Sequence, residues 1–202
     1  MKNILLLGSK SESRRTLLDN AKIPYQVVSQ DADETQCDWG LPLQKVVESI
    51  ALFKMEHVIM PAGKEGDSCF VLTADTLSQD CNGNIHGKPA DGDDAIRMLR
   101  AAAAGRNSCG TAFCLDKKIY KSGAWHLEQR IIKYIVAQYD FIIPENWIMR
   151  YIALGHGNDA AGAIRIEEYD SQFLKSVDGS YTTIVGLPMF ELRQALEEIG
   201  FF

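Results

Sequence analysis

Positively charged side chains and carboxylates that could act together on a phosphate chain are spread over the N-terminal half of this sequence. The cations are Arg14, Lys54 and Lys88, and the carboxylates are Glu34 and Asp75. Cations and a divalent metal can neutralise a polyphosphate, while carboxylates can hold that metal and activate water. Since the whole chain is acidic, with a net charge of −6, this separated set predicts a site for a polyphosphate with a divalent metal.

The first of these cations lies in the stretch GSKSESRR, residues 8–15, between a predicted strand and a predicted helix. A strand that turns into a helix directs unpaired backbone N–H groups outward, and the hydroxyls of Ser9 and Ser11 add donors beside them. Arg14 follows Ser11 by one helical turn and can share its face. The alternative is that Ser9 and Glu12 form a capping box and that the arginine is solvated.

Glu34 and Lys54 also have both a functional and a structural interpretation. Glu34 ends the segment DADE after a predicted strand, where carboxylates can hold a hard cation or simply form a solvated acidic loop. Lys54 shares the apolar stripe of a predicted helix with Val47 and Ile50. A lysine there either reaches an anion in a cleft or extends its ammonium along apolar surface to water.

Asp75 follows a predicted strand, and Lys88 lies in a predicted turn. Asp75 comes directly after the apolar strand CFVLTA, at the end of a strand where α/β proteins bind ligands; the alternative is a helix or turn cap. Lys88 stands between Gly87 and Pro89 on a stiff backbone, which suits a phosphate contact, although an exposed turn lysine is the alternative.

Apolar periodicity predicts the elements that must position these residues. The predicted strands are Asn3–Leu7, Tyr25–Ser29, Cys69–Ala74, Ser108–Leu115, Lys118–Lys121 and Leu127–Tyr139, and the predicted helices are Glu12–Ala21, Pro42–Ile59, Asp93–Ala104, Pro144–Leu154 and Leu187–Gly200. The later strands have no helical spacer and are expected to be antiparallel neighbours. The sequence thus predicts an α/β fold with a mixed, partly antiparallel sheet flanked by helices.

Composition excludes several classes of protein. With 202 residues and 46% apolar content, the chain predicts a single packed domain over residues 1–202. No Lys/Arg-rich block is long enough to bind a DNA or RNA duplex. The apolar runs are too short for a membrane span or a secretory segment, so we expect a cytoplasmic protein without a membrane partner. Five cysteines without a C-x-x-C pair indicate free thiols in a reducing compartment.

Several short motifs occur in the order typical of one family, and the chain resembles the Maf family, once described as septum-formation inhibitors. The motifs cover nearly the whole chain and are S-x-S-x-x-R (Ser9, Ser11, Arg14), D-E (Asp33, Glu34), Lys54 on the second long helix, A-D-T (Ala74 to Thr76), G-K-P (Gly87 to Pro89), A-G-A (Ala161 to Ala163) and GSYTTIVGLP (Gly179 to Pro188). Agreement of several motifs in one order makes coincidence an unsatisfactory explanation.

The resemblance implies a nucleoside triphosphate pyrophosphatase with a fold similar to the inosine triphosphate pyrophosphatases, two lobes around a cleft, and a homodimer. The implied reaction converts a nucleoside triphosphate and water into the monophosphate and pyrophosphate with Mg²⁺ or Mn²⁺. By the same resemblance, Asp75 is the catalytic carboxylate and Glu34 its acidic neighbour, and both are metal-linked. The phosphate-binding residues implied by the family are Ser9, Ser11, Arg14, Lys54 and Lys88.

Departures from the family pattern bear on base selection, for which the family uses the positions of Ser13, Thr76 and Glu167. Ser13 stands where some relatives have arginine, and Ala160 replaces a frequent lysine. Thr76 matches the branch that is similar to thymidine and uridine triphosphatases, whereas Glu167 matches the branch that is similar to enzymes acting on 7-methylguanosine triphosphate. Because a glutamate can accept two donors from a guanine-type edge, the residues favour a modified or purine-like base.

Two other functions remain open at this point. One is a nucleotide-binding regulator of cell division without turnover, supported by the departures at Ser13, at Ala160 and at Glu168, where a glycine is usual in the family. The other is a generic metal phosphatase, which would release inorganic phosphate instead of pyrophosphate. Simultaneous retention of the carboxylates and lysines favours the pyrophosphatase, which would remove unwanted nucleotides from the cellular pool.

Overall fold

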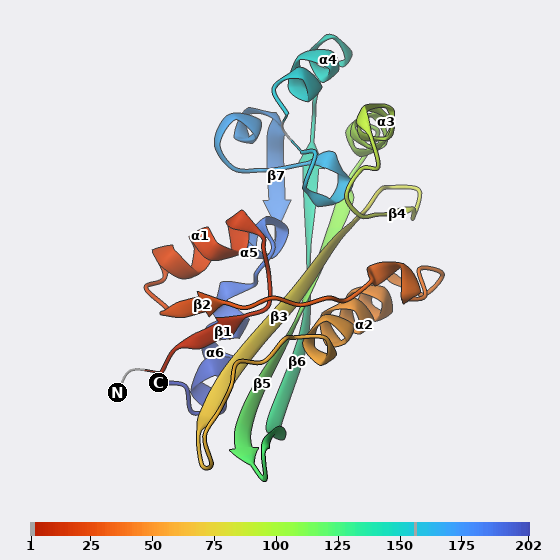
Figure 1. Ribbon diagram of the computed structural model, residues 1–202. Helices are drawn as coiled ribbons and strands as arrows, with labels where there is room; N and C mark the ends of the chain where they lie inside the picture. The colour runs from red at the N-terminus through yellow and green to blue at the C-terminus, as the bar shows by residue number, and fades with distance from the viewer. Residues whose placement is uncertain (1–2, 156) are drawn as a thin grey trace. The chain divides into compact units, whose positions relative to one another are not determined.

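The computed structural model describes residues 3–155 and 157–202 (Figure 1). Its strands are β1 (Leu5–Leu7), β2 (Tyr25–Val27), β3 (Ser68–Gln79), β4 (Ile85–His86), β5 (Asn107–Lys121), β6 (Ala124–Phe141) and β7 (Leu174–Asp178). Its α-helices are α1 (Glu12–Asn20), α2 (Leu43–Glu56), α3 (Gly92–Ala103), α4 (Glu145–Ala153), α5 (Tyr181–Val185) and α6 (Met189–Glu198). Three 3-10 helices are η1 (Glu34–Gln36), η2 (Ala161–Ala163) and η3 (Glu168–Phe173).

The sheet is mixed, as the sequence predicted. Its strand order is β2-β1-β3-β5-β6-β7, and β4 pairs with β3 outside this order. β1 is parallel to both β2 and β3, whereas β7 is antiparallel to β6. The turn Ser122–Gly123 between β5 and β6 has both residues at positive φ, the conformation of a two-residue β-hairpin, so these long neighbours are antiparallel. The predicted mixed α/β class is therefore confirmed.

The chain divides into two compact units. Unit 1 comprises Met1–Asp75, Ala112–Tyr134 and Gly186–Phe202, and unit 2 comprises Thr76–Thr111 and Ile135–Val185. The predictions of one domain over residues 1–202 and of a cleft between two lobes are not tested by this division and stay predictions.

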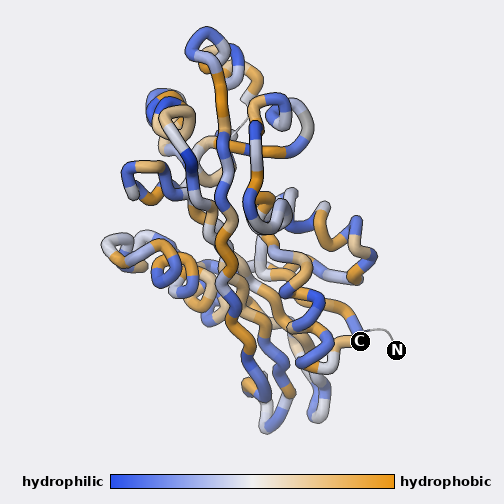
Figure 2. The backbone as a smooth tube through the Cα atoms, turned by 180° about the vertical axis from the view of Figure 1, so that it is seen from behind, coloured by the Kyte–Doolittle hydropathy of each residue, from blue (hydrophilic) through white to orange (hydrophobic). Residues whose placement is uncertain are grey.

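Each unit has its own buried apolar residues. In unit 1, Leu6 of β1 and Val71 of β3 pack with Met55 of α2 and Cys114 of β5. Unit 2 has a larger cluster, in which residues of α3 and α4 pack with Tyr139 and Phe141 of β6. Figure 2 shows hydrophobic and hydrophilic residues alternating along the long strands. Both cores follow from the alternation of apolar residues in strands and the apolar stripes of the helices.

Some element boundaries differ from the predicted ones. The strand predicted to stop at Ala74 continues to Gln79, so Asp75 lies within β3 and not after it. The two segments predicted after α3 form the single strand β5. β4, β7 and α5 were not predicted because each has at most five residues, too few to show a periodic pattern. In residues 3–155 and 157–202, no helix is long and apolar enough to cross a membrane.

Candidate active site

A lysine between two carboxylates forms the centre of the candidate site in unit 1. Glu34 begins η1, Lys54 lies in α2 and Asp75 lies in β3. The Lys54 Nζ atom is 2.8 Å from Glu34 Oε1 and 2.6 Å from Asp75 Oδ1. Three segments that are distant in the sequence thus place one cation against two anions.

The backbone elements explain why these side chains meet. Val47, Ile50 and Ala51 of α2 are fully buried, and this apolar stripe carries Lys54 inward with them. Lys54 does not extend to water, because only 7% of the residue is exposed and its ammonium is paired. β1 pairs with β3 only as far as Leu7 and Leu72, so Asp75 lies beyond the end of its short neighbour although it is inside its own strand.

Burial dominates the electrostatics of Asp75. Desolvation raises the pKa of this carboxyl group above its ordinary value, against the opposing charges of Lys54 and Arg14, and the negative charge of Glu34 acts in the same direction as burial. Asp75 Oδ2 is buried and has no hydrogen-bond partner among the residues that the structure describes. A carboxylate with a raised pKa and an uncommitted oxygen is suited to accept a proton from water.

The GSKSESRR stretch is organised differently from the capping box that its sequence suggested. Ser11, and not Ser9, is the N-cap of α1, and its Oγ accepts from the Arg14 backbone N–H at 3.4 Å. Ser9 Oγ accepts from the Ser11 N–H at 3.3 Å and from Arg14 Nη1 at 3.1 Å. Because both hydroxyl oxygens act as acceptors, each hydroxyl keeps its proton for donation to an anion.

Arg14 is buried instead of solvated, which excludes the surface alternative. Its Nε donates to the Gly186 carbonyl at 2.8 Å, in the segment between α5 and α6. Arg14 also lies close enough to Asp75 to lower the pKa of that carboxyl group, although the effect is smaller than those of burial and of Lys54. Ser9, Ser11 and Arg14 are therefore in the same unit as the carboxylates and close to one another. Ser13 is half-buried on α1.

The remaining predicted residues, Thr76, Lys88 and Glu167, belong to unit 2. Thr76 is 2.9 Å from the hydroxyl of Thr111, which donates its proton to the Thr183 carbonyl at 2.7 Å. With that proton committed, Thr76 is the donor to Thr111. Lys88 is exposed in the loop between β4 and α3. That these three residues act together with the unit 1 residues stays a prediction.

Glu167 is half-buried and does not simply face solvent. One carboxylate oxygen accepts from the backbone N–H of Ile166 at 3.0 Å. Burial raises the pKa of the Tyr181 phenol, and the nearby charge of Glu167 raises it further. A carboxylate and an aromatic hydroxyl are therefore neighbours within unit 2, which is compatible with the predicted role of Glu167 in base selection.

Two residues near the site were missed by sequence reasoning. Gly186 lies inside the GSYTTIVGLP motif and accepts a hydrogen bond from Arg14 at its backbone carbonyl, a contact that no sequence pattern predicts. Cys37 lies near the carboxylates: burial raises the pKa of its thiol, and the charges of Glu34 and Asp75 raise it further. A thiol held protonated in this way is a poor metal ligand, so Cys37 does not alter the donor set.

The implied divalent metal fits the residues present. No three or more His, Cys, Asp or Glu side chains of the described chain form a group that could hold a metal ion. Mg²⁺, however, is commonly bound by one or two carboxylates together with substrate phosphates. Glu34, whose side chain is 41% exposed, and Asp75 supply that pair of hard oxygen donors. Because a carboxylate has about four lone-pair sites, Asp75 can face a cation and still accept a proton at Oδ2.

Comparison with known proteins gives a family and several relatives. The sequence model described as "Maf-like protein" matches residues 4–199. A relative from Geotalea uraniireducens, named dTTP/UTP pyrophosphatase, is 34% identical over 98% of this chain and 96% of its own. Proteins of the same name from Caldicellulosiruptor saccharolyticus and Hydrogenovibrio crunogenus are each 30% identical; they cover 98% and 100% of this chain and 95% and 99% of their own.

Among solved structures, a HAM1 protein from Coxiella burnetii is similar with a TM-score of 0.48 and 12% identity, over 97% of this chain and 99% of that one.

Proposed function

This chain belongs to the Maf-like protein family, and we propose that it hydrolyses a nucleoside triphosphate to the monophosphate and pyrophosphate. The observation that carries the proposal is the Lys54 ammonium between Glu34 and the buried Asp75. The names of the relatives, which cover nearly the whole chain, support the same activity. An ion pair built only for stability would leave the raised pKa and the unpartnered oxygen of Asp75 unexplained.

Each residue of the candidate site in unit 1 has its own role in the proposed reaction. Asp75 Oδ2 accepts a proton from water while Lys54 holds the other carboxylate oxygen in place. The water oxygen forms a bond to the α-phosphorus, and the bridging P–O bond breaks so that pyrophosphate leaves. Ser9 and Ser11 donate hydroxyl protons to phosphate oxygens, and Arg14 adds positive charge beside them.

A divalent cation completes this proposal. Lys54 is matched by two carboxylates, so this cluster alone does not attract a polyanion. Mg²⁺ or Mn²⁺ held by Glu34 and Asp75 would neutralise phosphate charge that builds up during the reaction. Removal of the metal with a chelator is therefore expected to stop turnover.

The base is proposed to be thymine or uracil. The relatives are named for dTTP and UTP, and Thr76 matches the branch of the family that is similar to thymidine and uridine triphosphatases. Glu167 supports the alternative, a guanine-type or methylated base, because its carboxylate can accept two donors. A cytoplasmic location and a homodimer remain predictions of the sequence.

A panel of triphosphates tests the proposal. Purified protein with Mg²⁺ or Mn²⁺ is assayed with dTTP, UTP, GTP and 7-methyl-GTP, and pyrophosphate and inorganic phosphate are measured separately. We expect pyrophosphate without inorganic phosphate, with dTTP and UTP preferred. Release of inorganic phosphate indicates a phosphatase, and nucleotide binding without any product indicates a regulator. If GTP or 7-methyl-GTP is preferred and Glu167→Gln reduces that preference, the substrate carries a guanine-type or methylated base.

A further inference from the structure

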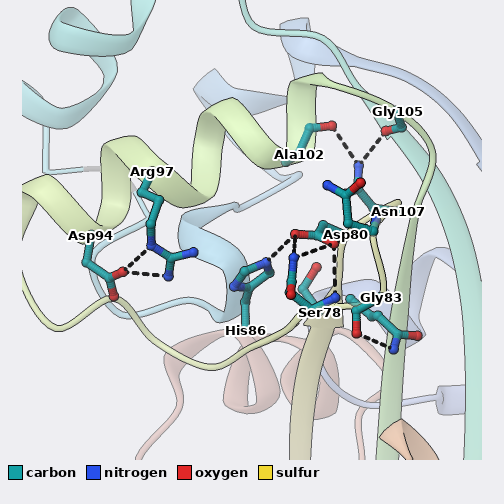
Figure 3. Close-up of polar contacts among 12 residues, drawn as sticks. Ser78, Asp80, Gly83, His86, Asp94, Arg97, Ala102, Gly105 and Asn107 are labelled. Carbon is teal, nitrogen blue, oxygen red and sulfur yellow. Dashed lines mark hydrogen bonds and ion pairs between the residues drawn. The ribbon is translucent and has the colours of Figure 1, made fainter.

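A buried hydrogen-bonded pair in unit 2, Asp80 and His86, lies directly before the loop that carries Lys88. Asp80 follows the end of β3, and His86 is the second residue of β4, which pairs with β3. His86 Nε2 is 2.9 Å from Asp80 Oδ2, and the two residues are 5% and 6% exposed. Figure 3 shows the imidazole directed at this carboxylate. The sequence offered no signal for the pair, since its members are separated by a turn.

Asp80 also organises the turn between the two strands. Its Oδ1 accepts from the backbone N–H groups of Asn82 at 2.8 Å and Asn84 at 3.0 Å, and its Oδ2 accepts from Asn84 Nδ2 at 2.9 Å. Burial opposes ionisation of Asp80, but the hydrogen bonds from Asn84, His86 and Asn82 outweigh it and lower its pKa to about 2. Asp80 is therefore a fixed anion at neutral pH, and His86 is held against it.

The loop after His86 is fastened at two more points. The Gly87 carbonyl accepts from the Gly162 N–H at 2.9 Å, in the A-G-A segment. The Ala90 N–H donates to Asp94 Oδ2 at 3.0 Å, in the first turn of α3. Gly162 cannot be replaced freely, because it has a φ of 68° and an added Cβ would lie 3.0 Å from Ser78 Cβ. Backbone contacts thus fix both ends of a loop in which Lys88 is exposed.

We propose that the Asp80–His86 pair is a positioning device for Lys88, holding the start of its loop so that the ammonium meets a substrate phosphate. His86 does not touch the substrate in this role; it fixes the backbone two residues before Lys88. A lysine has four flexible side-chain bonds, so a fixed backbone reduces the entropy lost when its ammonium binds a phosphate. The inference rests on the proposed function, because it presupposes a phosphate contact by Lys88.

The groups around His86 agree with a positioning role. Asp80 faces it from the turn, and Asp94 is close to it from α3. Hydrogen bonds from Ala90 and Arg97, together with the charge of His86, lower the pKa of Asp94. Because Asp94 itself binds Ala90 at the far end of the loop, both carboxylates near His86 hold the Lys88 loop.

Replacement of the imidazole tests the proposal. His86→Leu removes the donor to Asp80 with similar volume, and we expect KM to rise about tenfold while kcat changes less than about twofold, since one positioned ionic contact is weakened. His86→Gln retains a side-chain N–H donor and is expected to restore KM to within about threefold of the unmodified protein. His126→Leu is the matched control: His126 is exposed on β6 and contacts the Lys121 carbonyl, so KM should not change.

A double-mutant cycle separates positioning from general stabilisation. If His86 acts through Lys88, His86→Leu should raise KM less than about twofold in a Lys88→Ala background. An equal rise in both backgrounds, or no recovery in His86→Gln, overturns the proposal. Should His86→Leu fail to fold, Asp80→Asn serves in the same cycle.

Hydrogen exchange distinguishes failure of this inference from failure of the proposed function. In His86→Leu, the amides of Ala90 and Gly162, which donate to Asp94 and to the Gly87 carbonyl, should exchange about tenfold faster than in the unmodified protein, and no activity is needed for this measurement. Unchanged exchange overturns the positioning role, even if pyrophosphate is released. Absence of pyrophosphate from every triphosphate overturns the proposed function and, with it, the phosphate contact of Lys88.

Discussion

The Lys54 ammonium and its two carboxylates are the most informative group of side chains in the molecule. Burying an ion pair gives little stability, because removing charges from water offsets their attraction. Asp75 is 6% exposed, and one of its oxygens has no hydrogen-bond partner in residues 3–155 and 157–202, an arrangement that is unfavourable for a buried polar atom. A catalytic role for the cluster explains this unfavourable burial, because a carboxyl group with a raised pKa can accept a proton during the reaction.

Lys54→Met should destabilise the protein more at high pH than at low pH. Without the ammonium, Glu34 and Asp75 face each other as anions, and the loss should approach about 3 kcal/mol at pH 8. The pKa of Asp75 is already raised and would rise further without Lys54. As the pH falls through that raised pKa, Asp75 becomes neutral and the penalty declines. Urea unfolding at pH 8 and pH 5 measures the difference.

Lys45→Met is the control for this comparison. Lys45 lies on the same helix with a side chain that is 65% exposed, and its pairing with Glu48 is a surface contact. Its replacement should change the free energy of unfolding by less than about 0.5 kcal/mol at either pH. Equal losses at pH 8 and pH 5 for Lys54→Met would show that the lysine acts by packing and not by charge.

At the scale of elements, the turn between β3 and β4 gives a pH-dependent contribution to stability. The pKa of Asp80 is about 2 in the folded protein, against 3.8 for a free aspartate side chain, so the folded state favours the ionised form. This stabilisation is present above the unfolded value and is lost as pH falls toward 2. Asp80→Asn should therefore be less stable than the unmodified protein at pH 6, and this difference in stability should be smaller at pH 3.

Thermal unfolding at the two pH values measures this difference, with Asp67→Asn as a control from another turn. Asp67 is exposed and accepts from the backbone N–H of Lys64. If the difference in unfolding temperature between Asp80→Asn and the unmodified protein is the same at pH 6 and pH 3, a stabilising role for the ionised carboxylate is contradicted.

Long periodic elements could be predicted from the sequence, whereas short ones could not. The apolar stripe of α2 and the closing helix α6 repeat over several turns, so local pattern sufficed. β4 has two residues, and its formation depends on pairing with β3 instead of on its own pattern. The end of β3 was misplaced because Asp75 interrupts an apolar run but still continues the strand.

The residues of the candidate site could be predicted from the sequence more readily than the contacts between them. Glu34, Lys54 and Asp75 were recognisable as residue types, and the structure brings them together. The Gly186 carbonyl that holds Arg14 is 172 residues away in the chain, a long-range contact that no local spacing encodes. Ser9 and Ser11 showed the same limit: the structural alternative placed the helix cap on Ser9, whereas Ser11 caps α1.

At the scale of the whole molecule, the predicted site residues are shared between the two units. Unit 1 contains Asp75 and the serine-arginine stretch, whereas unit 2 begins with Thr76 and includes Lys88. Asp75 and Thr76 are consecutive in β3, so one strand carries both the proposed proton acceptor and a proposed base-selecting residue. The proposal that all of them serve one reaction depends first on the chemistry assigned to Asp75.

The most direct measurement is the rate of pyrophosphate release from dTTP or UTP by the unmodified protein, Asp75→Asn and Asp19→Asn. Asp19 is the control, an exposed carboxylate of α1 that contacts the Tyr25 hydroxyl. Loss of the proton acceptor should lower kcat by at least about 1,000-fold, with circular dichroism unchanged, while Asp19→Asn stays within about twofold. Pyrophosphate release by folded Asp75→Asn at the rate of the unmodified protein would contradict the account.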